Sequence, residues 1–316
     1  MAVLAGGALA IVEGISAYYI DKIETEDILG DIPAPEPDEP MNFLVLGSDS
    51  RSGEDTQSLD ETGSRSDVIM IVHIKADLSG AFVVSIPRDS YVEIPAYGDW
   101  GGGMNKINAA LSYGGASLTA KTVYNIAQIP FTGAMLINFD GVQNMVEAVG
   151  GIRACTAEAF ESSFNHIWYN SGCHDLTPQE AEFWTRERYN LQGSDLGRIK
   201  KQQEIIKGLM EKVTTTGVLT DPGKIDAFLT AVAAALTVDE SMNLRDLAFE
   251  LKDMNLDNVR FATAPVLGTE DIMIGGVPNN VVNLDVPGTR ELFDAIRNDT
   301  TDQWLAAHPQ PEIPTL

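Results

Sequence analysis

Three charged segments of this sequence adjoin short apolar runs, and their side chains are of the types that hold a metal ion and an anion. The segments are Ser48-Asp49-Ser50-Arg51, Arg65-Ser66-Asp67 and Pro87-Arg88-Asp89. Carboxylates suit a divalent cation, because Mg²⁺ binds one or two of them together with phosphate oxygens and water. The arginines between them suit an anionic substrate. Each aspartate could instead be a loop cap or a member of a surface ion pair.

A second polar set lies in the later half of the chain and is rich in arginine: Arg186, Arg188, Arg198 and Gln202. Residues four apart, such as Arg198 and Gln202, lie on one face of a helix. Arg186 and Arg188 share a side only where the chain is extended or leaving a helix. Guanidinium groups bind phosphate oxygens with two parallel hydrogen bonds and stay charged, so this set could surround a pyrophosphate. The alternative is a solvated helix with Arg–Glu pairs, each contributing less than about 1 kcal/mol.

Other catalytic motifs are absent from the sequence. It has no G-x-x-x-x-G-K-[ST] phosphate loop, no H-E-x-x-H pair and no G-x-S-x-G nucleophile turn. The four histidines are scattered along the chain and do not suggest a catalytic triad. The formal net charge of -25, with only 21 lysines and arginines, opposes binding to nucleic acid. Charge on this scale otherwise describes an acidic, solvated surface.

Two cysteines, Cys155 and Cys173, are the only ones in the chain. In an exported protein they would form a disulfide that closes a short loop and stabilises the fold by about 3 kcal/mol. In a cytosolic protein they would more often be reduced and unrelated. A zinc site is not expected, because it needs four ligands and only His166 and His174 lie nearby.

The N-terminal forty residues are expected to differ from the rest of the chain. Residues 1–23 contain an apolar run interrupted by Glu13, with no basic residue before it, which predicts part of a membrane anchor or an N-terminal helix. Residues 24–40 are acidic and rich in proline, and predict an extended spacer. Folded structure should then begin at Met41. Residues 301–316 are expected to form a C-terminal tail.

Short apolar runs predict buried strands next to the charged segments, at 42–47, 68–74 and 82–86, and further strands are expected at 134–139 and 258–264. Helical spacing predicts helices near 105–112, 116–127, 140–149, 178–187, 195–213, 223–237, 244–253 and 288–298. Near-continuous apolar strands indicate a sheet covered on both faces, and ligand crevices form at strand ends in such sheets. The alternation predicts one α/β domain.

Taken together and in order, several stretches resemble the LytR–CpsA–Psr family. They are NFLVLGSDSR at 42–51, RSDVIMIVHI at 65–74, SIPRDSYVEIP at 85–95, NKINAA at 105–110, NFDGVQNMVEAVGGI at 138–152, LTPQEAEFWTRER at 176–188 and DLGRIKKQQ at 195–203. The resemblance covers about residues 41–300. It implies a three-layer α/β/α fold with a central mixed sheet and a deep apolar pocket that holds the polyprenyl tail of a lipid-linked glycan.

The resemblance also implies a role for each polar residue. Asp49 and Asp67 would bind Mg²⁺, and Asp89 would support the metal or act as general base. The pyrophosphate would be bound by a larger set: Arg88, Arg186, Arg188, Arg198 and Gln202. Of these, Arg88 and Arg198, with Asp89, would carry the catalysis. Departures from the family pattern occur at Ser90 to Ile94, which lacks the basic residues of some relatives.

The function implied by the resemblance is transfer of a glycopolymer from a polyprenyl-pyrophosphate carrier to a cell-wall acceptor, either peptidoglycan or a surface protein. The enzyme would be tethered to the membrane by its N-terminal segment, with the catalytic domain outside the cell. Two other readings stay open. A receptor for polyprenyl glycolipid or wall polymer would not need the three aspartates, and a lipid pyrophosphatase would use water in place of the acceptor.

Overall fold

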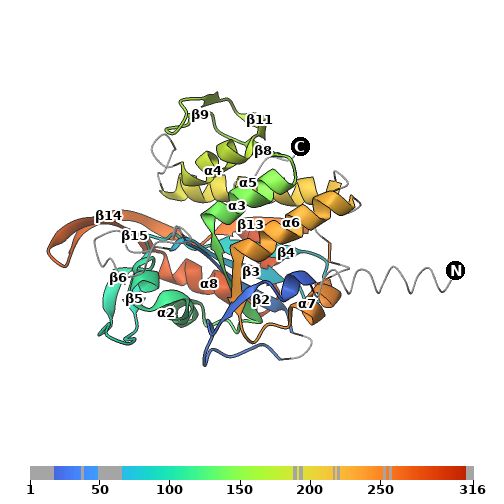
Figure 1. Ribbon diagram of the computed structural model, residues 1–316. Coiled ribbons are helices and arrows are strands. Elements are labelled where there is room, and N and C mark those ends of the chain that lie inside the picture. Colours follow the sequence, from blue (N-terminus) through green and yellow to red (C-terminus); the bar gives the residue numbers. More distant parts are fainter. Residues whose placement is uncertain are drawn as a thin grey trace.

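The computed structural model describes residues 18–36, 39–48, 66–187, 191, 195–215, 218, 221–251, 254–255 and 258–310. Within these residues a seven-stranded sheet has the order β1-β12-β7-β2-β3-β4-β13 (Figure 1). Its strands are β1 (Glu24–Glu26), β2 (Met41–Ser48), β3 (Ser66–Ile74), β4 (Ala81–Ser85), β7 (Gly133–Asn138), β12 (Leu236–Asp239) and β13 (Val259–Thr263). The sheet is mixed, because β3 pairs antiparallel with both β2 and β4, whereas β2–β7 and β4–β13 are parallel pairs.

Alternate side chains of the central strands enter two different layers. Leu44, Ile71 and Val84 are fully buried in a core that includes residues of α2 (Ala109–Ala127) and α8 (Val286–Arg297). Val45 and Met70 point to the opposite face, where they meet side chains of three further helices. These are α3 (Phe139–Ala148), α4 (Pro178–Arg186) and α5 (Asp195–Thr215). The predicted three-layer α/β/α fold with a central mixed sheet is therefore confirmed.

Three more helices lie around the sheet: α6 (Pro222–Ala235), α7 (Leu244–Glu250) and α9 (Thr301–Ala307). The predicted start of helix α4 at residue 178 is confirmed, and its first turn shows the reason. The Thr177 side chain accepts a hydrogen bond from the backbone N–H of Glu180, and the Glu180 carboxylate accepts one from the backbone of Thr177. This capping box, with proline in the first turn, starts the helix at Pro178.

Small hairpins extend the domain beyond the sheet. β8 (Ile152–Thr156) pairs with β11 (Gly172–Leu176), and β9 (Phe160–Glu161) pairs with β10 (Trp168–Tyr169). β5 (Tyr91–Ile94) pairs with β6 (Gly103–Lys106), so Asn105 and Lys106 lie in a strand where the helix at 105–112 was expected to begin. β14 (Val266–Ile274) and β15 (Val277–Leu284) form a long hairpin that projects from the body of the protein (Figure 1).

The predicted disulfide is present. Cys155 on β8 and Cys173 on β11 are direct partners in the strand register, with their Cα atoms 3.9 Å apart. The bond therefore joins the two strands of this hairpin beside helix α5, which packs on β8.

Two predictions about the ends of the chain were wrong. Folded structure begins before Met41, because β1 pairs with β12, and the Ile28 and Leu29 side chains are buried. The backbone N–H groups of Ile28 and Leu29 both donate to the Asp239 carboxylate, which fixes this segment on the sheet. At the other end, α9 buries Trp304 in the core, so residues 301–307 are not a free tail. In both cases one or two apolar side chains anchor a polar segment.

The expected anchor falls mainly on residues 1–17, which lie outside the described residues. No helix in the part of the chain that the structure describes is long and apolar enough to cross a membrane.

Candidate functional site

The ends of β2 and β3 lie side by side where the metal ligands are expected. The register pairs Gly47 with Val68 and Ser48 with Ser66, with an irregularity between them. A Cβ atom at Gly47 would lie 2.7 Å from the Cβ of Val68, so glycine lets the two strands approach here. Asp67 is part of β3 beside this irregularity. Its side chain and the whole of Asp49 lie outside what the structure describes, so their assignment to Mg²⁺ stays a prediction.

The loop after β4 carries Arg88 and Asp89 as expected. Their side chains are 11% and 13% exposed, and the Arg88 Nε lies 3.8 Å from the Asp89 Oδ2. Lys106 Nζ is 3.3 Å from the Asp89 Oδ1, to which the Asn108 side-chain amide also donates at 3.5 Å. The Asn108 backbone N–H donates to the Arg88 carbonyl at 3.1 Å. The NKIN stretch at 105–108 therefore braces the loop that presents Arg88.

Helix α4 ends between the expected arginines. Arg186 is its last residue, and Glu187 has extended backbone. The chain thus leaves the helix at this point, which is the condition under which Arg186 and Arg188 can lie on the same side. Arg186 Nη1 lies 2.8 Å from Glu182 Oε1 on the same helix, an Arg–Glu pair of the kind that the alternative expects, and its role at a pyrophosphate stays a prediction. Arg188 lies outside the described residues. Glu187, which the sequence reading did not select, is fully buried and accepts hydrogen bonds from the backbone and hydroxyl of Ser163 at 2.6 and 2.9 Å.

Helix α5 carries Arg198 and Gln202 into the interior. The two residues are 4% and 3% exposed, which a solvated helix face would not show. The neighbouring Gln203 donates from its side-chain amide to the Ser85 hydroxyl at 2.9 Å and to the Ala262 carbonyl at 3.2 Å. These bonds fix α5 across β4 and β13. Arg198 and Gln202 are thus held on the helix that crosses the end of β4. The last residue of that strand, Ser85, precedes Arg88 by three residues in the chain.

A small apolar cavity of about 80 Å³ lies under this part of α5. Its walls come from β2, β3 and β7 on the sheet and from α3, α4 and α5 above it. Gln202 and Ile206 contribute from α5, and Val45 and Met70 contribute from the sheet. At about 80 Å³ this cavity is much smaller than the deep lipid pocket that the family resemblance implies, so that pocket stays a prediction.

A buried polar network on the other side of α5 was missed by the sequence reading. Lys201 Nζ lies 2.9 Å from the Glu204 Oε2 and donates to the Thr156 hydroxyl at 2.5 Å, and the Trp184 indole donates to Glu204 at 2.8 Å. Burial lowers the pKa of Lys201 and raises the pKa of Glu204, while the attraction between the two charges opposes both shifts. In the sequence, KKQQE at 200–204 is indistinguishable from a solvated helix face, so no signal pointed to it.

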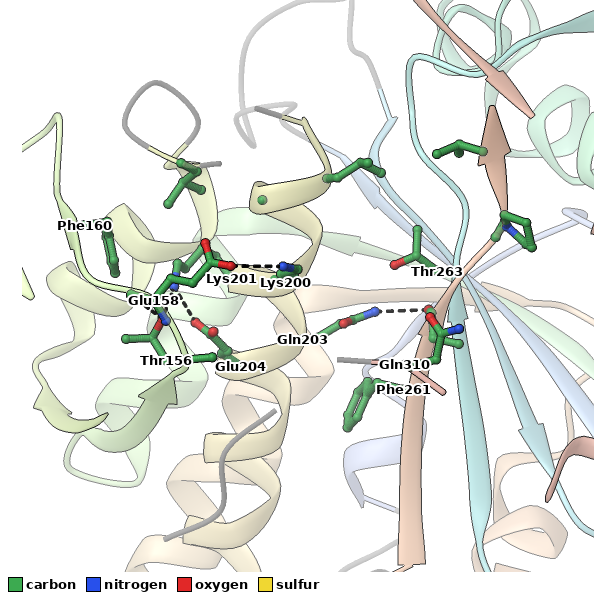
Figure 2. A pocket seen from close by; sticks show the side chains of 18 of the residues that line it. Thr156, Glu158, Phe160, Lys200, Lys201, Gln203, Glu204, Phe261, Thr263 and Gln310 are labelled. Carbon is green, nitrogen blue, oxygen red and sulfur yellow. Dashed lines mark hydrogen bonds and ion pairs between the residues drawn. The ribbon is translucent and has the colours of Figure 1, made fainter. Parts of the chain in front are cut away.

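This network lines a larger cavity of about 430 Å³ (Figure 2). Its walls are α5, the segment from Thr156 to Phe160, the end of β13 with the residues after it, and the chain from Trp304 to Gln310. Among the residues that the structure describes, no group of three or more His, Cys, Asp or Glu side chains could hold a metal ion.

The comparisons with known proteins agree with this architecture. The profile of the LytR_cpsA_psr family matches residues 16–290. The chain is 30% identical over 263 residues to "Probable cell wall biosynthesis protein LcpB" of Corynebacterium glutamicum, covering 81% of this chain and 61% of that protein. It is 31% identical over 208 residues to "Polyisoprenyl-teichoic acid--peptidoglycan teichoic acid transferase TagU" of Bacillus anthracis, covering 66% of this chain and 64% of that protein. The chain thus spans about six tenths of the length of these relatives.

Solved structures share the fold at lower sequence identity. A LytR-Csp2A-Psr enzyme from Actinomyces oris has a TM-score of 0.64 at 19% identity, covering 87% of this chain and 96% of that one. "TagT bound to LI-WTA" has a TM-score of 0.63 at 22% identity, covering 88% and 98%. The family profile covers most of the sequence, and the resemblance stated from its motifs is confirmed. The chain belongs to the LytR–CpsA–Psr family.

Proposed function

We propose that this protein is a phosphotransferase that moves a glycopolymer from a polyprenyl-pyrophosphate carrier to peptidoglycan or a surface protein of the cell wall. The observation that carries the proposal is the placement of Arg198 and Gln202. Both are buried on α5, where Gln202 lines the small apolar cavity and the neighbouring Gln203 donates to Ser85 at the strand end that leads to Arg88. A buried guanidinium at this place suits the charged pyrophosphate of such a donor.

The relatives support the same reaction class. LcpB is named as a probable cell wall biosynthesis protein, and TagU is named as a polyisoprenyl-teichoic acid–peptidoglycan teichoic acid transferase. The specific donor, acceptor and carrier of this chain are part of the proposal, as is its placement at the outer face of a membrane through the N-terminal segment.

The proposed reaction breaks the phosphoanhydride bond of the donor and forms a phosphate ester bond to the acceptor. The acceptor hydroxyl attacks the phosphorus that bears the glycan, and the bond from that phosphorus to the bridging oxygen breaks. Polyprenyl phosphate leaves with the electron pair, one phosphate stays with the glycan, and the hydroxyl proton passes to a base. Charge grows on the departing phosphate, where Arg88 and Arg198, with Arg186, Arg188 and Gln202, would stabilise it.

Asp89 is the candidate base or metal support. Its carboxylate oxygens lie 3.8 Å from the Arg88 Nε and 3.3 Å from the Lys106 Nζ. Asp49 and Asp67 would hold Mg²⁺, since two carboxylates at adjoining strand ends are the donor set that Mg²⁺ shares with phosphate oxygens. A bound Mg²⁺ would neutralise charge on the pyrophosphate.

The test is turnover of a lipid-linked glycan donor by the purified protein in the presence of peptidoglycan, with Mg²⁺ and with EDTA. We expect turnover that requires Mg²⁺. Arg198→Ala should lower kcat/KM by about 10²- to 10³-fold, because one preorganised charge at the transition state is lost. Arg290→Ala, which removes an exposed arginine from α8 on the other face of the sheet, is the matched control and should keep wild-type turnover. Tight donor binding without turnover would favour the receptor, and near wild-type activity of Arg198→Ala would contradict the proposed site.

A further inference from the structure

The β14–β15 hairpin extends away from the central sheet and its helices and ends in an apolar tip (Figure 1). The tip, residues 272–278, has the sequence IMIGGVP, with no charged side chain and no side-chain N–H or O–H group. Met273 and Val277 within it are 63% and 61% exposed. Exposed apolar segments of this kind mark sites of interaction with another protein or with a membrane.

The strand register places apolar side chains on both faces of the tip. Met273 pairs with Pro278, and Ile274 pairs with Val277. Directly opposed residues of an antiparallel pair share a face, and successive residues of one strand point to opposite faces. The two pairs therefore lie on opposite sides of the hairpin. The turn that joins them, Gly275-Gly276, has φ values of +59° and +84°, which suit glycine, and it adds no side chain to either face.

A tip that is apolar on both faces fits a lipid bilayer better than a protein partner. A second protein or a second copy of this chain would pack on one face and leave the other in water, whereas lipid surrounds both. A stable protein interface also takes about 20–30 residues on each side, far more than residues 272–278 supply.

A polar band directly behind the tip limits how far it can enter. Glu270 and Asp271 are exposed, and the side-chain amides of Asn283 and Asn280 donate to their carboxylates at 3.1 and 2.7 Å. Carboxylates are costly inside a bilayer, so insertion stops at residue 272. Three residues at about 3.4 Å each give a depth of about 10 Å, which is the depth of segments that lie at a membrane interface.

The base of the hairpin is bonded to the loop of the candidate site. The Val282 backbone N–H donates to the Asp89 carbonyl at 2.8 Å, and the Val282 side chain is buried. Val282 pairs with Thr269, and the six residues from there to Gly275 span about 20 Å. The hairpin thus connects the loop that carries Asp89 to an apolar tip about 20 Å away.

The hairpin and the N-terminal segment belong to opposite edges of the sheet. The segment that we propose as the anchor enters the fold through β1, the strand at one edge, and the hairpin follows β13, the strand at the other. Contact with a bilayer at both edges would fix how the protein lies on the membrane, which one tether alone does not.

We propose that residues 272–278 insert into the surface of a lipid bilayer and hold the candidate site at a set distance from it. The purpose of this contact rests on the proposed function, because a lipid-linked donor resides in the bilayer.

A fluorophore at the tip tests the insertion in the full chain. Cys155 and Cys173 are bonded to each other, so Met273→Cys supplies the single free thiol for a nitrobenzoxadiazole label. With phosphatidylcholine vesicles, the emission of this label should shift to shorter wavelength and be quenched by spin-labelled lipid. Thr269→Cys is the matched control, since Thr269 is exposed on the same face of the hairpin behind the polar band, and its label should stay in water. Vesicle binding through the N-terminal segment changes neither label, because each reports only its own surroundings.

A charge variant tests the apolar character of the tip. Ile274→Glu/Val277→Glu places two carboxylates on the face opposite the Met273→Cys label. The lipid concentration for a half-maximal emission change should rise about tenfold or more, because the carboxylates resist transfer into lipid. The matched control is Leu267→Glu/Val286→Glu, which adds the same charge at two exposed apolar residues outside the tip, 75% and 60% exposed, and should leave the response unchanged.

The inference is overturned if the two labels respond alike or if the two charge variants respond alike. It is also overturned if the emission of the tip label changes with protein concentration without vesicles, which would assign the tip to a second copy. Because the readout is insertion, its failure is separable from that of the proposed function. Insertion without transfer would contradict the transferase alone, and transfer from a vesicle-borne donor without insertion would contradict the inserted tip alone.

Discussion

Two charged side chains of α5, Lys201 and Glu204, lie next to each other in the interior, with side-chain exposures of 4% and 5%. Each is stable there only because the other is present, since an unpaired buried charge costs several kcal/mol. Thr156 and Trp184 complete the set of hydrogen bonds. The pair joins α5 to the end of β8 and lines the larger cavity.

Removing one member of this pair should destabilise the protein far more than removing both. We expect Glu204→Ala to lower the free energy of unfolding by about 3–5 kcal/mol, because Lys201 is left as a buried charge. The double variant Lys201→Met/Glu204→Leu should recover most of that loss. Urea unfolding of both single variants and the double variant measures the coupling. Additive losses would show that the two charges do not depend on each other.

His73 is a second buried ionisable group, fully enclosed on β3. Its ring nitrogens lie 2.9 Å from the Asn42 side-chain oxygen and 3.0 Å from an Asp299 carboxylate oxygen. Burial lowers the pKa of His73, and the Asp299 carboxylate offsets part of that shift. The unfolded chain, with a histidine pKa near about 6.5, therefore takes up the proton more readily than the folded protein.

Acid should thus weaken the fold through His73. Its contribution is retained above about pH 6.5 and lost as the pH falls through the lower folded pKa, at about 1.4 kcal/mol for each unit of pKa difference. We expect the free energy of unfolding of His73→Gln to fall less between pH 7 and pH 5 than that of the wild type. His166→Gln, which removes an exposed imidazole, is the control. Equal slopes for His73→Gln and wild type would disprove the linkage.

Among the elements, the β8–β11 hairpin is the one closed covalently. Cys155 and Cys173 face each other in its register, and α5 packs on β8. Gly208 of α5 has no room for a side chain, because a Cβ there would lie 2.6 Å from the Arg153 carbonyl oxygen. The hairpin and the helix that carries Arg198 are therefore one closely packed unit.

Loss of the disulfide should lower stability measurably. The double variant Cys155→Ser/Cys173→Ser should unfold with about 3 kcal/mol less free energy than the oxidised wild type, because the unfolded chain regains the freedom of the open loop. Thermal unfolding with and without reductant is the measurement. Reductant should lower the Tm of the wild type and leave the Tm of the double variant unchanged. A wild-type Tm that does not respond to reductant, with both thiols then titratable, would contradict this.

The elements that the sequence predicted well are strands with a near-continuous apolar run and helices with a clear start. β2, β3 and α4 are examples, the last through the Thr177 capping box. Elements held by distant partners could not be predicted. β1 has no apolar pattern and exists because it pairs with β12, two hundred residues away in the chain. Trp304 reads as a lone aromatic residue in a polar tail, and only the fold reveals the core that it enters.

The residues of the candidate site also fall into those that the sequence could locate and those that only the fold reveals. The sequence placed Arg88 and Asp89 correctly at a strand end and put Arg198 and Gln202 on one helix. It could not show that Lys201 and Glu204 are buried, because burial depends on what packs on the helix. The Arg186–Glu182 pair shows the converse, a local i,i+4 contact that sequence spacing alone anticipates.

At the scale of the whole molecule, α5 is the common wall of two cavities on one face of the sheet. The chain carries a net charge of -25, so it repels an anionic donor everywhere except where arginines gather. The proposed arginine set would concentrate attraction for a pyrophosphate at one place. The smaller cavity lies over β2 and β3, and the larger one lies over β13.

The most direct test of the account is the identity of the two products formed from a lipid-linked glycan donor with peptidoglycan present. Mass spectrometry should find polyprenyl monophosphate and a glycan attached to peptidoglycan through a phosphodiester, both dependent on the acceptor. Polyprenyl monophosphate and free glycan phosphate formed equally well without peptidoglycan would contradict the account and identify a lipid pyrophosphatase instead.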